Sequence, residues 1–189
     1  MDTPFPTLNC TAFVTYSGAR VVLDQWYVTG QPSAAAYPAI AQAGIGSVIC
    51  LRDPDETNPQ PPPVPPVPPF DTQEAATLAA LGVTYLNVVI TRTMTQAQFD
   101  EAATEAALRL LQDGASKPAL IHCSTGDRAS SVFAALLIGL DLLSHDRAVQ
   151  YAENSLLLAN SSMIELVQGY RVPGGQVAAL RAAGTSFRR

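Results

Sequence analysis

Positively charged residues are scarce in this sequence. Lys and Arg total 11 against 16 Asp and Glu, which leaves a formal net charge of −5 and a sequence pI near 4.8. The only lysine is Lys117. A chain this acidic lacks the broad positive field that binds nucleic acid, so we expect no nucleic-acid partner. A local anion pocket is still compatible with it, because one or two arginines with converging backbone N–H groups suffice.

Cysteine and histidine are also few. The three cysteines, Cys10, Cys50 and Cys123, are odd in number and widely separated, which argues against a disulfide framework and favours a reducing cytoplasm. We interpret Cys10 and Cys50 as packing residues. The two histidines, His122 and His145, come without a clustered cysteine pair, so we predict no metal site. Neither a dinucleotide-binding nor a Walker-type glycine pattern occurs, and no cofactor is expected.

Long apolar runs are absent as well. The longest, Val132–Leu140, is far shorter than a membrane span and is better interpreted as a buried helix. The first residues, Met1–Pro6, show neither the basic region nor the apolar stretch of a signal peptide. We therefore expect no membrane partner and a cytoplasmic location. At 189 residues the chain suits one well-filled core, and we expect a single domain over residues 1–189. The sequence leaves the oligomeric state open.

Hydrophobic spacing alternates between strand and helix patterns along the chain. Strand patterns occur within 12–30 and at 47–51, 83–90 and 119–122, and helix patterns at 34–43, 72–81, 95–112 and from 128 onward, with breaks near 144, 160–161 and 173–175. Ser33 is a candidate N-cap with Gly44 as the stop, and Thr95 and Gln98 have capping-box spacing. This order predicts an α/β fold, a single domain with a central, mostly parallel sheet flanked by helices.

Residues 59–69 are dominated by proline and must form an extended loop of polyproline type. A stiff connector is the simpler interpretation, because it needs no partner; a ligand for a proline-binding module is the alternative. The loop could also form one wall of a cleft.

The most informative stretch joins the strand pattern at 119–122 to the next helix. It reads Cys123-Ser-Thr-Gly126-Asp-Arg128 and lies at the carboxyl end of an apolar strand, where open α/β sheets bind ligands. Gly126 allows a tight backbone path, so that loop N–H groups and the positive helix end converge on one point. Such a site stabilises a bound anion and also a thiolate, which makes Cys123 a candidate nucleophile. Arg128 adds a planar fork suited to two oxygens of a tetrahedral oxyanion.

The stretch His122-Cys123-Ser-Thr-Gly126-Asp-Arg128-Ala-Ser130 resembles the signature loop of the protein tyrosine and dual-specificity phosphatase superfamily. The loop here has one residue fewer between the glycine and the arginine. Further segments, together with Glu56 and the shortened loop, are similar to the phosphatase-like domain of the beta-lactamase hydrolase-like family; they are 27–33, 43–45, 47–52 and 83–85. The resemblance covers about residues 26–152, outside the proline-rich loop, and implies a cysteine-phosphatase-like fold.

Transferred to this sequence, the resemblance implies that Cys123 attacks phosphorus to form a thiophosphate intermediate and that Arg128 binds the phosphoryl oxygens. The loop residues would complete the anion cradle, with His122 as an orienting neighbour. Arg52 and Arg92 either face the pocket or are surface charges. The substrate-binding candidates are Ser124, Thr125, Gly126, Ser130, Arg52 and Arg92.

The general acid is not evident. The superfamily places an aspartate on a loop that here spans 91–95 and contains no carboxylate. Asp55 or Glu56 beside the proline-rich loop, or Asp127 within the cradle, are the substitutes. An inward-pointing Asp127 would oppose both thiolate and phosphate by like charge, so a carboxylate turned to solvent or paired with an arginine is the alternative.

Three functions are compatible with this loop. The favoured one is a cysteine-dependent phosphatase acting on a phosphorylated small molecule or a phosphoprotein. A rhodanese-like sulfurtransferase with a persulfide on Cys123 is the second, because the six-residue loop is also similar to rhodanese-type loops and encloses less volume. An inactive oxyanion-binding module is the third, suggested by the missing acid.

Overall fold

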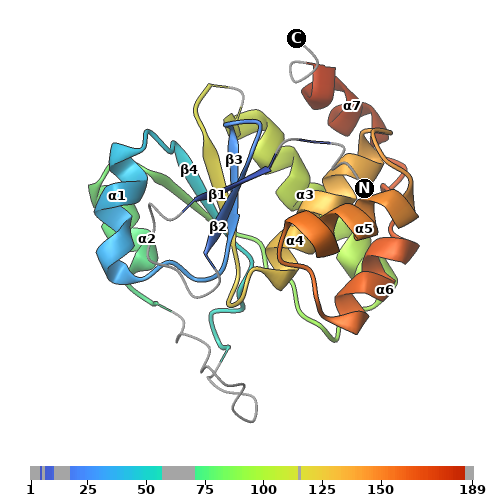
Figure 1. Cartoon of the computed structure of the whole chain (residues 1–189), viewed down its shortest axis with the longest axis horizontal. Coiled ribbons are helices and arrows are strands. Elements are labelled where there is room, and N and C mark those ends of the chain that lie inside the picture. The colour runs from blue at the N-terminus through green and yellow to red at the C-terminus, as the bar shows by residue number, and fades with distance from the viewer. Residues whose placement is uncertain (1–4, 6, 11–17, 57–70, 115, 186–189) are drawn as a thin grey trace.

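One six-stranded sheet forms the centre of the molecule (Figure 1). The computed structural model describes residues 5, 7–10, 18–56, 71–114 and 116–185. The sheet order is β1-β2-β3-β6-β4-β5. The strands are Thr7–Cys10 (β1), Ala19–Val22 (β2), Trp26–Thr29 (β3), Ser47–Cys50 (β4), Thr84–Asn87 (β5) and Ala119–His122 (β6). The β1–β2 and β2–β3 pairs are antiparallel, and the β3–β6, β6–β4 and β4–β5 pairs are parallel, which confirms the predicted mostly parallel sheet.

Helices cover both faces of the sheet, as expected when crossovers connect parallel strands (Figure 1). On one side lie α1 and α2, and on the other side lies the group α3 to α7. The helices are Tyr37–Gln42 (α1), Glu74–Ala80 (α2), Gln96–Gly114 (α3), Asp127–Gly139 (α4), His145–Ser155 (α5), Ser161–Gly169 (α6) and Val177–Thr185 (α7), and a short 3-10 turn, Ala34–Ala36, precedes α1. The α/β fold class is therefore confirmed.

Local signals in the sequence mark some helix ends correctly and others not. At the start of α3 the capping box is confirmed: the Thr95 N–H donates to Gln98 Oε1 at 2.9 Å and the Gln98 N–H donates to Thr95 Oγ1 at 3.4 Å. Ser33 does occupy an N-cap position, but its hydroxyl makes no capping hydrogen bond, and the element that it begins is a 3-10 turn that precedes the α-helix. The proline-rich loop at 59–69 lies outside the described residues.

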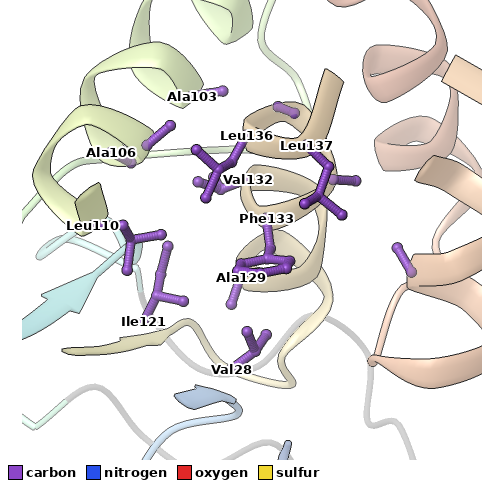
Figure 2. Packing of buried hydrophobic residues seen from close by; sticks show 14 of the residues in the cluster. Val28, Ala103, Ala106, Leu110, Ile121, Ala129, Val132, Phe133, Leu136 and Leu137 are labelled. Carbon is purple, nitrogen blue, oxygen red and sulfur yellow. The ribbon is translucent and has the colours of Figure 1, made fainter. Parts of the chain in front are cut away.

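The long apolar run predicted to be a buried helix is α4, which occupies the middle of the larger core (Figure 2). Ala129, Val132 and Phe133 on α4 are fully buried and pack with Ile121 of the sheet. The Phe133 ring also meets Trp26 of β3 edge to face at 5.6 Å between centroids. A helix that is buried nearly all round is rigidly held, so its amino end is fixed against the carboxyl end of β6.

None of the helices in the described part of the chain has the length and apolar character needed to span a membrane.

Candidate active site

The loop between β6 and α4 forms a cradle closed by its own backbone. Gly126 is the N-cap residue of α4 and has a left-handed φ of 94°. Its N–H donates to the Cys123 sulfur at 3.2 Å. Cys123 is fully buried at the base of the loop, directly after the last residue of β6. The sulfur therefore lies beside a main-chain donor and the amino end of α4, an arrangement that suits a bound anion.

Glycine is required at position 126 for two reasons, and each predicts a cost of substitution. A Cβ here would overlap the side chain of Leu157, and φ is positive. Gly82 has a comparable φ of 74° with open space around it. We expect Gly82→Ala to lower the free energy of unfolding by about 1–2 kcal/mol through backbone strain alone. Gly126→Ala should cost about 1–3 kcal/mol more, because the methyl group overpacks. Urea denaturation measures both, and equal costs would contradict a steric role of Leu157.

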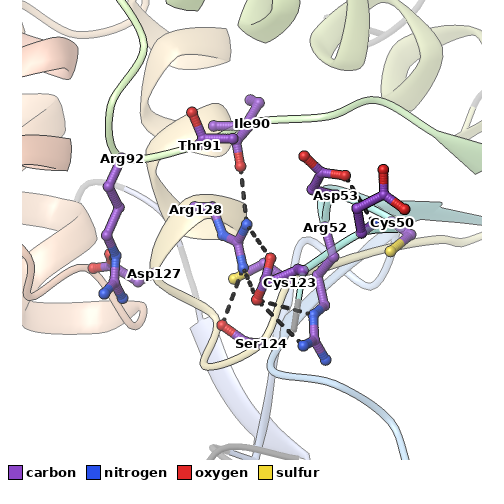
Figure 3. A network of polar contacts seen from close by, with 12 residues as sticks. Cys50, Arg52, Asp53, Ile90, Thr91, Arg92, Cys123, Ser124, Asp127 and Arg128 are labelled. Atoms are coloured by element: carbon purple, nitrogen blue, oxygen red, sulfur yellow. Dashed lines mark hydrogen bonds and ion pairs between the residues drawn. The ribbon is translucent and has the colours of Figure 1, made fainter. Parts of the chain in front are cut away.

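Arg128 is anchored on three sides at the entrance to the cradle (Figure 3). Nη1 donates to Glu56 Oε2 at 2.8 Å and to the Ile90 carbonyl at 2.9 Å. Nη2 donates to Glu56 Oε1 at 3.0 Å and to Ser124 Oγ at 3.1 Å. Burial by itself lowers the pKa of Arg128, but the neighbouring Cys123 and Glu56 raise it above its ordinary value. The guanidinium is therefore a permanent, pre-positioned positive charge beside the thiol.

Glu56 joins the two buried arginines of the site. Besides its bidentate pair with Arg128, its Oε1 accepts from Arg52 Nε at 3.2 Å. Arg52 has no exposed surface, and its Nη1 donates to Gln31 Oε1 at 3.1 Å. Burial raises the pKa of Glu56, but its contacts with Arg128 and Arg52 outweigh burial and hold the pKa below 4.5. Glu56 is thus an ionised counter-charge.

Removing the charge of Glu56 is expected to reduce stability in a pH-dependent way. Because the pKa of Glu56 is lower in the folded chain, the carboxylate contributes stability above its ordinary pKa of 4.5 and loses it as the pH falls through the folded value. Near pH 7 we expect Glu56→Gln to lower the free energy of unfolding by about 1–3 kcal/mol, because Arg52 and Arg128 lose their counter-charge. The loss is limited because solvent partly screens the Glu56 carboxylate.

Urea denaturation between about pH 7 and pH 3 should show the wild-type and Glu56→Gln curves converging at the acid end. Glu105→Gln on the exposed face of α3 is the matched control and should change stability little at either pH. A constant difference across the range would contradict an ionised Glu56.

The structure does not bring the other two candidate acids to the thiol. Asp55 is exposed, and its N–H donates to Asp53 Oδ1 in a local turn. Asp127 is buried but turned away from the cradle: its Oδ1 accepts the N–H groups of Ala159 and Asn160 at 2.8 and 2.9 Å. Its Oδ1 atom therefore ties α4 to the segment before α6.

The sequence left open whether Arg52 and Arg92 face the pocket or the surface, and the structure separates them. Arg52 is fully buried beside Glu56. Arg92 is 46% exposed and approaches Asp127 Oδ2 at 3.8 Å (Figure 3). Arg92 and Thr125 line a surface hollow of about 420 Å³ beside the cradle. The hollow is completed by Asp127, Leu157, Ala159 and Asn160.

Ser130 stabilises the loop from within α4. Its hydroxyl donates to the Gly126 carbonyl at 2.8 Å and accepts the Leu157 N–H at 2.9 Å. Its described contacts therefore fix the backbone at Gly126, and none of them reaches the Cys123 sulfur.

His122 points to the opposite side of the strand from Cys123, as the alternation of a strand predicts. The ring is fully buried, and its Nε2 lies 3.1 Å from Glu74 Oε1. Gln31 Nε2 donates to Glu74 Oε2 at 3.2 Å. A continuous polar network thus runs from His122 through Glu74 and Gln31 to the arginine pair. Sequence reasoning missed Gln31 and Glu74, whose signal was weak: a polar residue before a proline and an acid in a first helical turn.

Comparison with known proteins shows which solved structures share this fold. No protein-family model matches this chain, and no curated protein matches it in sequence. Solved structures do match. TpbA of P. aeruginosa is 14% identical, with 93% of this chain and 98% of TpbA covered and a TM-score of 0.61. The catalytic domain of the PP-IP phosphatase Siw14 of S. cerevisiae is 14% identical, with 95% and 96% covered and a TM-score of 0.62.

PTPMT1 is also similar, at 16% identity with 86% of this chain and 95% of that chain covered and a TM-score of 0.54. At such identities the likeness defines the fold, which is that of the tyrosine and dual-specificity type phosphatases. The narrower resemblance to the beta-lactamase hydrolase-like family stays a prediction.

Proposed function

We propose that this chain is a cysteine-dependent phosphatase that hydrolyses a phosphomonoester through a thiophosphate intermediate on Cys123. One observation carries the proposal: the Gly126 N–H donates to the Cys123 sulfur at 3.2 Å inside a loop that also positions Arg128 beside that sulfur. A nucleophile, a ring of main-chain donors and a guanidinium are the parts that phosphoryl transfer to a thiolate needs.

The contacts of Arg128 leave one side of its fork suited to the substrate. Glu56 occupies the end formed by Nη1 and Nη2, and Ile90 takes the second Nη1 hydrogen. The remaining donors are Nε and the Nη2 hydrogen that Ser124 Oγ now accepts, and they lie on the same side of the planar group. A phosphoryl group that displaces Ser124 Oγ gains two parallel hydrogen bonds while Glu56 stays in place.

The reaction follows from this placement. The Cys123 sulfur attacks phosphorus, the phosphorus–oxygen ester bond breaks, and the leaving group departs with the bonding electrons and takes up a proton. Water then attacks the thiophosphate, releasing inorganic phosphate and the thiolate. Gly126 and the other loop N–H groups, with Arg128, stabilise the charge on the phosphoryl oxygens in both steps.

The substrate class proposed is a phosphorylated small molecule or a phosphoprotein residue. A phosphorylated small molecule is supported by a structure of TpbA, which shares this fold, with phosphotyrosine bound. The leaving group would occupy the hollow beside the cradle, where Arg92 and Thr125 are placed to contact it.

The test is p-nitrophenyl phosphate hydrolysis by the wild-type chain and by Cys123→Ser. We expect release of p-nitrophenol by the wild type and a loss of at least about 10³-fold in the variant. Mass spectrometry of rapidly quenched enzyme should show a phosphoryl adduct on Cys123. Thiocyanate formation from thiosulfate and cyanide, with a sulfur adduct on Cys123, would instead identify a sulfurtransferase. Phosphate binding without either activity would identify an inactive module.

A further inference from the structure

A second cluster of reactive side chains lies on the far side of β6 from Cys123. It consists of Cys50 at the end of β4, Glu74 at the start of α2 and His122 at the end of β6. Their sulfur, carboxylate and ring nitrogen atoms all lie within 4.8 Å of one another. All three residues have no exposed surface. Cys50 and His122 are direct neighbours across the parallel β4–β6 pair, so the sheet register holds two members of the cluster together.

The contact between His122 and Glu74 sets two buried acceptor atoms of this cluster against each other when the His122 ring is neutral. The ring Nδ1 lies 3.4 Å from the Cys123 carbonyl oxygen, which accepts only, so Nδ1 carries a hydrogen. In the neutral ring Nε2 then carries a lone pair, and it faces Glu74 Oε1 at 3.1 Å. Both atoms are buried, and their contact is an ion pair only when the ring carries a second proton. Two acceptors at this distance repel each other unless a proton or a metal ion lies between them.

The atoms present match the ligand preferences of a borderline-soft divalent ion. Zinc binds thiolate sulfur, imidazole nitrogen and carboxylate oxygen, and nitrogen and oxygen ligands at about 2.0–2.1 Å in a tetrahedron lie roughly 3.3 Å apart. The separation of Nε2 and Oε1 in the structure is 3.1 Å. One thiolate and one carboxylate would neutralise the double charge of the ion inside the core, which buried charges require.

The groups around the cluster have the arrangement of an outer ligand shell. A metal-bound histidine typically donates its other ring N–H to a carbonyl, as His122 Nδ1 does to Cys123. Ligating carboxylates are themselves hydrogen-bonded, and Gln31 Nε2 donates to Glu74 Oε2, leaving Oε1 directed at the cluster. The hydroxyl of Tyr85 hydrogen-bonds to Cys50, so the sulfur too has a polar neighbour.

We propose that Cys50, Glu74 and His122 form a structural binding site for a divalent transition-metal ion, with zinc as the ion that best fits this ligand set. No metal site is predicted from the sequence, because these three ligands come from distant segments that only the fold joins. Binding would release the Cys50 thiol proton and hold the ends of β4 and β6 and the start of α2 together. Because His122 precedes Cys123, the ion would also stiffen the cradle.

The proposal is tested on the full chain without a histidine tag, refolded from denaturant with zinc or with EDTA, since a buried site fills as the chain folds. Metal content is measured by mass spectrometry and stability by thermal denaturation. We expect about one equivalent of zinc and a higher midpoint in the zinc-refolded wild type. Cys123→Ser keeps the three ligands and should retain both properties. Cys50→Ser and Glu74→Gln should each lose most of the bound zinc.

Refolding with Co²⁺ keeps the test decisive if those two variants fail to fold. The wild type and Cys123→Ser should both show a thiolate-to-cobalt charge-transfer band, which assigns the sulfur ligand to a cysteine other than the nucleophile. A wild-type chain that retains less than about a tenth of an equivalent of zinc, with a midpoint insensitive to metal, would overturn the proposal and assign the position to a proton. Zinc content unchanged in folded Cys50→Ser and Glu74→Gln would overturn it too.

Discussion

Replacing Arg128 by lysine is expected to lower kcat/KM for p-nitrophenyl phosphate by about 10²–10³-fold, the usual loss when one oxyanion-stabilising donor is removed. Lysine keeps the positive charge but not the planar fork. The fork is what allows Arg128 to hold Glu56 at one end and to offer two parallel donors to a phosphoryl group on its side. An ammonium group can satisfy Glu56 or the substrate, but not both in this geometry.

The control for this change is Arg181→Lys on α7, where Arg181 forms an exposed ion pair with Asp141. It should leave kcat/KM and stability within error of the wild type. Phosphate inhibition should also weaken in Arg128→Lys, which distinguishes lost anion binding from a general fold defect, and circular dichroism should show a native spectrum. Retention of most of the activity with unchanged phosphate inhibition would exclude Arg128 from the anion site.

The second large effect expected is a steep dependence of rate on the leaving group. A general acid contributes about 10²–10⁴-fold to the expulsion of a poor leaving group. Among the described residues, Glu56 is held ionised between Arg128 and Arg52, and Asp127 is bound to two backbone N–H groups. We therefore expect kcat/KM for an alkyl phosphate to fall about 10²–10⁴-fold below that for an aryl phosphate of similar size, the range a missing acid would give.

A series of substituted phenyl phosphates measures this dependence as the slope of log kcat/KM against the pKa of the leaving phenol. A steep negative slope is the expected result. A flat series, or an acid-requiring limb of the pH profile that Asp55→Asn or Asp127→Asn removes, would show that one of these carboxylates does reach the leaving oxygen and that the acid-free arrangement is wrong.

The cradle was accessible from the sequence because its determinants are local. Strand β6, the Cys123–Arg128 loop and the start of α4 are contiguous, and a glycine with φ of 94° is needed wherever the chain makes this turn. The same holds for the capping box at Thr95, which involves neighbouring residues only. Periodicity predicted the order of strands and helices for a similar reason, since burial on one face repeats along each element.

The partners of these residues were decided by the tertiary structure. Nothing local to Glu56 indicates that it pairs with Arg128. The carboxylate of Asp127 turns away from the cradle because the N–H groups of Ala159 and Asn160, brought close by the packing of α6 on α4, offer it two hydrogen bonds.

The sequence by itself thus determined the fold class and a tight glycine-containing loop that carries a cysteine and an arginine, because backbone conformation and hydrophobic periodicity are encoded within a few neighbouring residues. The tertiary structure decided which charges meet. It placed Glu56 on Arg128 and brought Cys50, Glu74 and His122 into one buried cluster. Pairing between distant side chains depends on strand register and helix packing, which no short stretch of sequence specifies.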